Sequence, residues 1–278
     1  MTKRLIYYFY LTPDFKENRA NRINLECLRR YAMIFDSADI YLSTDNASDV
    51  HTIREAEKEF ISMPFNGNIS FKVVENTEFC ESKVIKEEIL DNLISLDCLV
   101  FFAHAKGYTN ITTYDYNLDG IQKWIVGCYY LSLGNMDEVV EILDGNYCTL
   151  SYGSFPVVSQ KKITEDELYQ EWNNLFPGRI KHNWYYSGTF FWINAPRLYN
   201  YLNVFSPTVP KMSDRYFGER LLGNLYAYDK HACGHNQRFL FPCNFYNEGV
   251  LDGALNFILN EDEREDFKRF YDDIISKI

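Results

Sequence analysis

The sequence predicts an α/β fold in which a mostly parallel β-sheet is covered by helices on both faces. Two observations lead to this prediction. Short apolar strands alternate with amphipathic helices through the first 105 residues, a rhythm typical of right-handed β-α-β units. The run at 98–105 (CLVFFAHA) is apolar almost without interruption, as expected of a central strand buried on both faces.

The elements follow from local patterns taken in chain order. Residues 4–10 (RLIYYFY) form a β-branched and aromatic run that stops before Pro13, which indicates a strand. Residues 21–35 place apolar side chains at helical spacing. By the same criteria we expect further strands at 38–44, 69–75, 98–105, 147–154 and 188–195, and helices at 52–61, 83–94, 117–134, 136–144, 214–226 and 261–278. The weak periodicity of 158–184 predicts a flexible excursion or lid.

Composition and charge exclude several classes of protein. A formal net charge of −11 argues against general nucleic-acid binding, because affinity for a polyanion comes largely from Lys and Arg. The seven cysteines include no C-x-x-C pair and predict reduced thiols in a cytoplasmic protein. The apolar run near the N-terminus is too short for a signal peptide, and no stretch approaches the ~20 apolar residues of a membrane span. Any membrane contact is therefore expected to be peripheral.

Ligands of parallel sheets bind beyond the carboxyl ends of the strands, so the segments 11–14, 43–46 and 104–110 are the first candidates for a site. The segment after the buried strand contains His104, Lys106 and Gly107. The lysine can neutralise a phosphate, the glycine can let the backbone approach it, and the histidine can bind a metal or donate a hydrogen bond. The alternative is a hydrogen-bonded core histidine followed by an ordinary turn.

A second candidate is the aromatic stretch 182–198 (HNWYYSGTFFWINAPRL). Ser187 and the Gly188 amide can hydrogen-bond a sugar hydroxyl or a phosphate. The side chains that would wall a pocket there are Trp184, Tyr185 and Trp192. For Phe190 and Trp192, a packed core strand is an equally good interpretation.

A third candidate is DRYFGERLLGNLY, which contains Asp214, Arg215 and Glu219. A carboxylate held beside a cation is what a general base for an acceptor hydroxyl requires, whereas an i,i+4 pair is by default only a surface ion pair. His231 and His235 flank Gly234, which makes a shared zinc on a helix improbable. The sequence lacks G-x-G-x-x-G, the P-loop pattern and G-x-S-x-G, which removes the sequence evidence for dinucleotide oxidoreductases, P-loop enzymes and serine hydrolases.

Four of these stretches, in order, resemble a family of bacterial surface-polysaccharide glycosyltransferase-like proteins: HAKG, Trp124 on the next helix, WYYSGTFFWINAPRL and DRYFGERLLGNLY. The resemblance covers about residues 4–245. It implies one GT-A-like domain with a nucleotide-sugar-binding half (1–110), an acceptor and catalytic half (111–245) and a C-terminal helical tail (246–278). The implied reaction moves a sugar from a nucleotide-diphosphate sugar to a glycan or lipid-linked acceptor, for capsule or lipopolysaccharide, in the cytoplasm or at the inner face of the membrane.

The resemblance also implies roles for individual residues. The base of an inverting mechanism would be Glu219 or Asp214. The residues implied in donor binding are Thr12, Arg19, Asp45, His104, Lys106, Gly107 and Arg215, with Arg22 close by. Those implied in acceptor binding are Trp184, Tyr186, Ser187 and Gly188.

One departure from the family pattern is the lack of any Asp-x-Asp motif, which in many GT-A enzymes holds Mn²⁺ or Mg²⁺ at the donor diphosphate. Negative charge develops on the leaving diphosphate and must be compensated. Either Lys106 with Arg215 or His104 does this without a metal, or Asp115, His231 or His235 completes an atypical metal site. The rival functions are a catalytically inactive glycan- or nucleotide-binding module and, ranked lowest, a phosphotransferase or nucleotidyltransferase.

Overall fold

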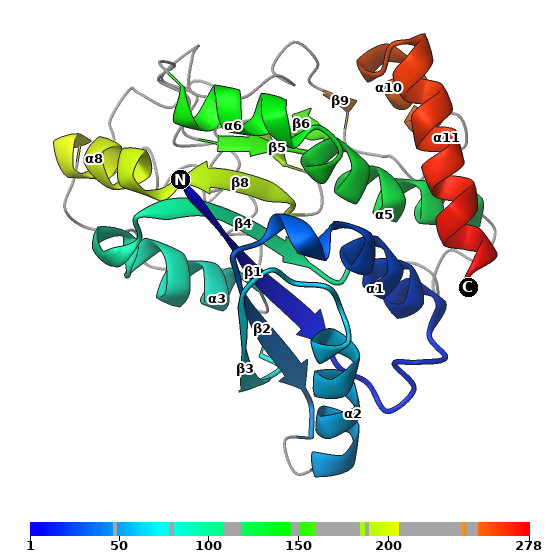
Figure 1. The fold of residues 1–278 in the computed structure, drawn as a ribbon, viewed down its shortest axis with the longest axis horizontal. Helices are drawn as coiled ribbons and strands as arrows, with labels where there is room; N and C mark the ends of the chain where they lie inside the picture. Colours follow the sequence, from blue (N-terminus) through cyan, green and yellow to red (C-terminus); the bar gives the residue numbers. More distant parts are fainter. Residues whose placement is uncertain are drawn as a thin grey trace. The chain divides into compact units, whose positions relative to one another are not determined.

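The computed structural model describes the chain in nine segments, namely residues 1–46, 49–77, 81–107, 118–145, 151–158, 184–186, 189–205, 241–242 and 250–278. Figure 1 shows the fold. The described strands are β1 (Thr2–Tyr10), β2 (Ser37–Thr44), β3 (Asn68–Glu75), β4 (Cys98–His104), β5 (Ser151–Gly153), β6 (Pro156–Val158), β7 (Trp184–Tyr186), β8 (Phe191–Asn194) and β9 (Phe241–Pro242). The described α-helices are α1 (Arg19–Tyr31), α2 (Val50–Ile61), α3 (Glu81–Val84), α5 (Leu118–Leu133), α6 (Met136–Asp144), α8 (Ala195–Phe205), α10 (Val250–Ile258) and α11 (Glu261–Ser276).

The main sheet has six strands in the order β3-β2-β1-β4-β8-β5. β2 and β3 pair in parallel, whereas β8 is antiparallel to both of its neighbours, β4 and β5. β5 therefore has the same direction as β4, and β8 is the reversed strand of this part of the sheet. The predicted fold class, a mostly parallel sheet with helices packed around it, is confirmed.

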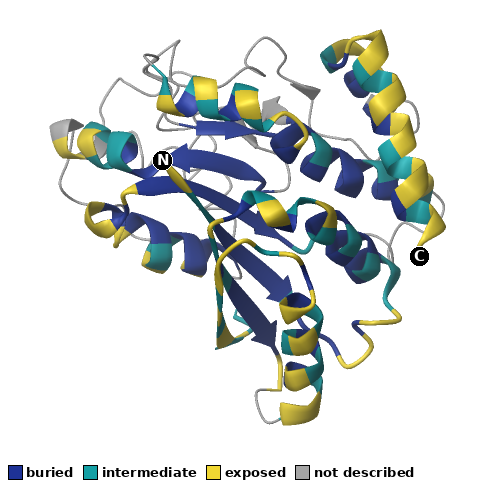
Figure 2. Cartoon of the chain, in the orientation of Figure 1, coloured by how far each residue is buried: buried dark blue, intermediate teal, exposed yellow. Residues whose placement is uncertain are grey.

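The chain divides into two compact units that are each assembled from three segments. Unit one consists of residues 1–5, 77–103 and 135–243, and unit two of residues 6–76, 104–134 and 244–278. The boundary passes through β1 and β4, so each of these strands contributes residues to both units. Figure 2 shows that β2, β4, β8 and the inner faces of the helices are largely buried, whereas every residue of β3 is exposed or half-buried.

In unit two, aromatic side chains of β1 form the centre of the core. Tyr7 and Phe9 both contact the Phe60 ring of α2 at centroid distances of 5.9 and 5.4 Å. The Tyr7 hydroxyl also lies 2.7 Å from that of Tyr129 on α5. Helices α2 and α5 therefore cover the same face of β1, and α1 packs against α5.

Helix α1 begins where its sequence provides a cap. The Asn18 side chain accepts a hydrogen bond from the Asn21 N–H, which satisfies one of the donors exposed at a helix start. The predicted helix 21–35 is therefore displaced: α1 starts at residue 19, and residues 32–34 form a 3₁₀ turn (η1, Ala32–Ile34).

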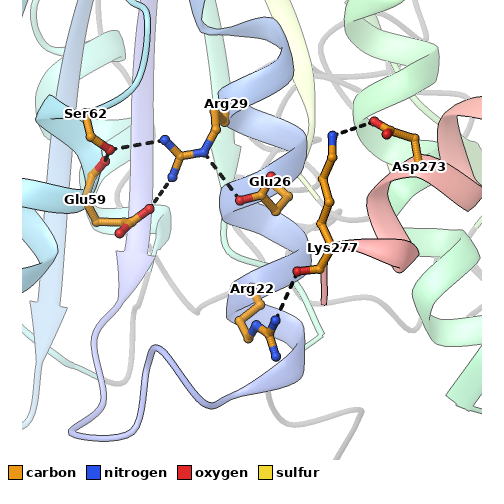
Figure 3. Close-up of polar contacts among 7 residues, drawn as sticks. All are labelled: Arg22, Glu26, Arg29, Glu59, Ser62, Asp273 and Lys277. Atoms are coloured by element: carbon orange, nitrogen blue, oxygen red, sulfur yellow. Dashed lines mark hydrogen bonds and ion pairs between the residues drawn. The ribbon is translucent and has the colours of Figure 1, made fainter.

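Charged side chains link the outer surface of α1 to neighbouring segments (Figure 3). Arg29 forms ion pairs with Glu26 and Glu59, and it donates a hydrogen bond to Ser62. Arg22 donates to the carbonyl oxygen of Lys277, just beyond α11, at 3.1 Å. On α2, Glu55 accepts hydrogen bonds from two lysine ammonium groups, those of Lys16 and Lys58.

The C-terminal helices complete unit two. α11 begins with a capping box in which Asn260 and Glu263 bond each other's backbone N–H groups. Its Phe267 ring packs on Tyr130 of α5 at 5.3 Å, and its Phe270 ring packs on Tyr31 of α1 at 5.4 Å. The prediction of a helix at 261–278 is confirmed.

Unit one contains the other half of the sheet. Phe101 of β4 pairs with Trp192 of β8, and their rings lie 4.9 Å apart. Phe190 and Trp192 are both fully buried, so the structure supports the core interpretation for these two aromatic residues. Asn194 at the end of β8 donates to the Leu143 carbonyl at 2.7 Å and accepts from the Arg197 N–H at 3.0 Å.

Several elements differ from their sequence-based predictions. The expected helix 83–94 consists of α3, a π-helical turn (η2, Ile85–Leu90) and a 3₁₀ turn (η3, Leu93–Ser95). The expected strand 188–195 is shorter, since it ends at Asn194 and continues directly as α8, which the sequence analysis missed. A second, three-stranded sheet in the order β7-β6-β9 was also missed.

Two predictions concern residues that are mostly outside the described part of the chain. They are the lid at 158–184 and the helix at 214–226. Among the cysteines that the structure describes, Cys27, Cys98 and Cys128 are buried as reduced thiols. Within the described residues, no helix combines the length and the apolar character that crossing a membrane requires.

Candidate functional site

The candidate site lies in unit two, where β1, β2, β3 and β4 end. The chain adds β2 and β3 on one side of β1 and then β4 on the other side, so the strand order reverses between β1 and β4. Ligands of open α/β sheets bind at such a switch point. Hydrogen bonds continue past the strand ends, from Leu11 N–H to Ser43 O at 2.7 Å and from Ala105 N–H to Tyr8 O at 2.9 Å. The segments that follow β1 and β4 are therefore held in register.

An oriented carboxylate, Asp45, directly follows β2. Its Oδ2 accepts a 2.5 Å hydrogen bond from the Tyr10 hydroxyl, and its Oδ1 accepts a 2.9 Å bond from the Asn76 side chain. The hydrogen bond from Tyr10, followed by that from Asn76, lowers the pKa of this carboxyl group. The Tyr8 hydroxyl donates to Ser43 Oγ at 2.6 Å and lies 3.4 Å from Asn76 Oδ1. Asp45 is thus an exposed, ionised acceptor whose direction is fixed by its neighbours.

Lys106 lies two residues beyond the end of β4. Its ammonium nitrogen lies 5.0 Å from the centre of the Trp124 ring on α5, a cation–π contact with a side chain that is only 2% exposed. The backbone of Lys106 is held separately, because its N–H donates to Asn24 Oδ1 and its carbonyl accepts from Asn24 Nδ2. The structure therefore fixes the backbone of this residue and places its charge over an aromatic face.

Gly107 adopts a φ of +90°, a conformation that only glycine adopts without strain. A Cβ atom at this position would lie 2.5 Å from Ile125 Cδ1, on the buried side of α5. The glycine is consequently required by backbone conformation and by packing against α5.

Thr12 and Arg19 lie between β1 and the first turn of α1. Thr12 is buried, and its hydroxyl has no hydrogen-bond partner in the described part of the chain. Arg19 donates from Nε and Nη2 to Gln122 Oε1 at 3.1 and 3.0 Å, which links the start of α1 to α5. Asn21 in the same turn is buried, and neither polar atom of its side chain has a partner among the described residues.

His104 is the last residue of β4 and is 6% exposed. The structure therefore brings six of the sequence-predicted donor residues into unit two, at or near the strand ends: Thr12, Arg19, Asp45, His104, Lys106 and Gly107. Arg22, by contrast, is directed to the chain end at Lys277.

The predicted catalytic and acceptor residues are mostly outside the described residues. Asp214, Arg215 and Glu219 fall there, as do Ser187 and Gly188. For Trp184 and Tyr186, the structure describes the backbone alone, in β7, where they pair with Val158 and Pro156. Asp115, His231 and His235, the alternative metal ligands, also lie outside, and the described residues contain no group of three or more His, Cys, Asp or Glu arranged to hold a metal.

Sequence reasoning missed Tyr10, Asn24, Asn76 and Gln122, which orient or anchor the predicted residues. A signal was present for one of them. Asn24 falls on the apolar face of the predicted helix 21–35, between Ile23 and Leu25, where an amide must find a partner if it is buried.

Comparisons with known proteins give only distant structural likeness. No protein-family model matches the sequence, and no curated protein is a significant match. Among solved structures, the chain is similar to a 4-diphosphocytidyl-2C-methyl-D-erythritol synthase (9% identity, 94% of this chain and 100% of that chain, TM-score 0.37). It is also similar to mouse xyloside xylosyltransferase 1 in its apo form (6%, 81% and 82%, 0.32) and to Aspergillus fumigatus core-mannan synthase A in a Mn/GDP form (9%, 83% and 67%, 0.33).

Proposed function

We propose that this protein is a glycosyltransferase that transfers a sugar from a nucleotide-diphosphate sugar to a glycan or lipid-linked acceptor of bacterial surface polysaccharide. The observation that supports it most is that an oriented carboxylate, Asp45, and a cation, Lys106, both follow strands at the sheet's switch point. Asp45 suits the hydroxyl groups of a ribose, which donate to a carboxylate. Lys106, which follows β4, suits a diphosphate. A nucleoside diphosphate presents both kinds of group.

The resemblance of HAKG and the two later motifs to surface-polysaccharide glycosyltransferases supports the rest of the proposal. In it, Ser187, Gly188 and the aromatic residues Trp184 and Tyr186 bind the acceptor. Glu219 or Asp214 removes the proton from the acceptor hydroxyl as the glycosidic bond to the diphosphate breaks. Lys106, aided by Arg215 or His104, compensates the charge that develops on the leaving diphosphate.

The first test is a thermal-shift screen against UDP-, GDP-, CMP- and dTDP-linked sugars, each with and without Mn²⁺. A ligand at 100 times its Kd stabilises the folded state by about 2.7 kcal/mol, which corresponds to a rise in Tm of about 5 °C for a chain of this size. A shift with one nucleotide family supports the proposal. The absence of a shift with every donor contradicts it.

Matched variants localise the binding. Lys106→Met is paired with Lys72→Met, because the Lys72 ammonium also lies over an aromatic ring, that of Tyr41 at 5.2 Å, but on the edge strand β3. Asp45→Asn is paired with Asp39→Asn, a β2 carboxylate at the opposite end of the strand that accepts from Ser70. We expect the Tm shift to be lost in the Lys106 and Asp45 variants and kept in both controls.

The second candidate function is a catalytically inactive nucleotide- or glycan-binding module, which the missing Asp-x-Asp motif favours. Turnover separates the two. If Glu219→Gln keeps the Tm shift and abolishes sugar transfer that the wild type performs, the transferase proposal is supported. A wild type that binds the donor but neither transfers nor hydrolyses it with any glycan acceptor is a binding module.

A further inference from the structure

Asn24 is a fully buried side chain that the sequence analysis assigned no role. Its amide makes four hydrogen bonds, to the segment after β4, to α5 and to its own helix α1. Oδ1 accepts from the Lys106 N–H at 3.0 Å and from the Tyr129 hydroxyl at 3.1 Å. Nδ2 donates to the carbonyl oxygens of Lys106 and Ala20, each at 2.7 Å. A buried amide with four partners is a rigid element of the structure.

The bonds to Lys106 replace those of a β-ladder. Ala105 N–H still bonds to Tyr8 O, as a residue next to β1 would. One residue later, the donor and the acceptor of the Lys106 backbone are both taken by the single amide of Asn24. The side chain thus holds the segment after β4 at the point where β1 no longer supports it.

A second layer of two tyrosine hydroxyl groups completes the hydrogen bonding of the amide. The Tyr129 hydroxyl donates its proton to Asn24 Oδ1. The Tyr7 hydroxyl, 2.7 Å away, is therefore the donor in the hydrogen bond between the two tyrosines. All three side chains are fully buried. The orientation of the amide is set by its other partners, because the Lys106 N–H can only donate and the carbonyl groups of Lys106 and Ala20 can only accept. Burial also raises the pKa of the Tyr7 and Tyr129 hydroxyls, so both remain protonated donors at neutral pH.

We propose that Asn24 is a positioning residue of the donor site: by clamping the backbone of Lys106, it sets where the Lys106 ammonium and the Gly107 amide meet the diphosphate. The inference rests on the proposed function. It also specifies that site further, because the Lys106 N–H is already bonded to Asn24 and does not bind the anion. The diphosphate is then recognised at this segment by the lysine side chain and by the Gly107 amide.

The clamp itself is tested without any ligand, by amide hydrogen exchange resolved to single residues. In Asn24→Ala, exchange at the Lys106 N–H should accelerate about tenfold or more, because its acceptor is removed. In Asn24→Asp we expect the same acceleration, because the second carboxylate oxygen would face the carbonyl oxygens of Lys106 and Ala20 and be repelled by them. Exchange at Ala105, whose acceptor is Tyr8 O, should change far less. Unchanged exchange at Lys106 in both variants would overturn the clamp.

The positioning role is tested with inorganic pyrophosphate as the probe, by titration calorimetry well below the Tm of each variant. We expect Asn24→Ala to weaken pyrophosphate binding about tenfold or more. The matched control is Asn194→Ala, which removes another buried asparagine that joins two segments, but in unit one. It should lower the Tm and leave pyrophosphate affinity unchanged.

The outcomes separate this inference from the proposed function. If the wild type binds pyrophosphate and Asn24→Ala binds it equally well, the positioning role is wrong even where Lys106 exchange has accelerated. If the wild type binds neither pyrophosphate nor any nucleotide sugar, the proposed function is contradicted and the positioning role with it. The exchange data then still report on the clamp as a structural element.

Discussion

Replacement of Gly107 by alanine should destabilise the protein by an amount that the structure allows us to estimate. The backbone at this position has a φ of +90°, where an L side chain costs about 1–2 kcal/mol. The new Cβ would also lie 2.5 Å from Ile125 Cδ1. Ile125 is fully buried, so its methyl group cannot turn into solvent, and overpacking of this kind costs about 1–3 kcal/mol.

The two contributions together predict a loss of about 2–5 kcal/mol in the free energy of unfolding, measured by urea titration with near-UV circular dichroism. Gly253→Ala is the control, since Gly253 lies on α10 with no atom within 4 Å of its would-be Cβ. That variant should be stabilised by about 0.5–1 kcal/mol, because alanine favours a helix interior over glycine.

A double-mutant cycle with Ile125→Val separates the two causes. Ile125→Val alone should cost about 0.5–1.5 kcal/mol. Because valine lacks the Cδ1 methyl group that the new Cβ would hit, Gly107→Ala should cost less in that background, with a coupling of about 1–3 kcal/mol. Gly107→Ala with wild-type stability would refute the strain argument. Full additivity with Ile125→Val would refute the assigned clash.

Three further predictions concern other parts of the fold. Asn194→Ala should lower the free energy of unfolding in a urea titration by about 2 kcal/mol, because it removes the N-cap of α8 and leaves the Leu143 carbonyl without its buried donor. Asn194→Asp keeps the cap and should lower the free energy of unfolding by less. Asn260→Ala should cost about 1 kcal/mol by loss of the α11 capping box, and an unchanged melting curve would contradict that role. Glu55, whose pKa two lysine ammonium groups lower from 4.5 to about 2, contributes stability that is present above pH 4.5 and is lost as the pH falls towards 2. Stability measured across this window should fall less steeply in Glu55→Gln, and a high salt concentration should diminish the difference; equal slopes in both proteins at low salt would exclude the contribution.

The sequence was sufficient for the order of strands and helices in the first half of the fold, because local patterns decide that order. The alternation of strands and helices up to residue 104 is visible in the spacing of apolar side chains, and the buried run of β4 identified the centre of the sheet. The failure at α8 has a local cause. Phe191–Asn194 and Ala195–Phe205 join without a loop, although Asn194 before Ala195 and Pro196 is a helix-start signal that the strand-like run concealed.

The positions of Asp45 and Lys106 just after buried strands were predictable from the sequence, whereas the side chains that hold them were not. Asp45 and Lys106 were identified because the carboxyl ends of strands are where ligands bind. The partners that orient them are separated from them by 31 to 82 residues, as with Asn76 and Asn24, and such pairings depend on tertiary contacts that a single sequence does not contain. The left-handed conformation of Gly107, and its contact with Ile125, likewise need the position of α5.

The interleaved composition of the two units has a consequence for synthesis on the ribosome. Unit two begins with residues 6–76 and ends with residues 244–278. The last segment contains α11, which packs on Tyr31 and Tyr130 of the two earlier segments. Unit one likewise needs residues from 1–5 through 135–243. Neither unit can fold completely while a large part of the chain is still to be translated. The apolar strands of the nascent polypeptide therefore stay exposed to aggregation for much of its elongation. We expect chaperones that bind such nascent strands to raise the yield of folded protein more than slower translation does.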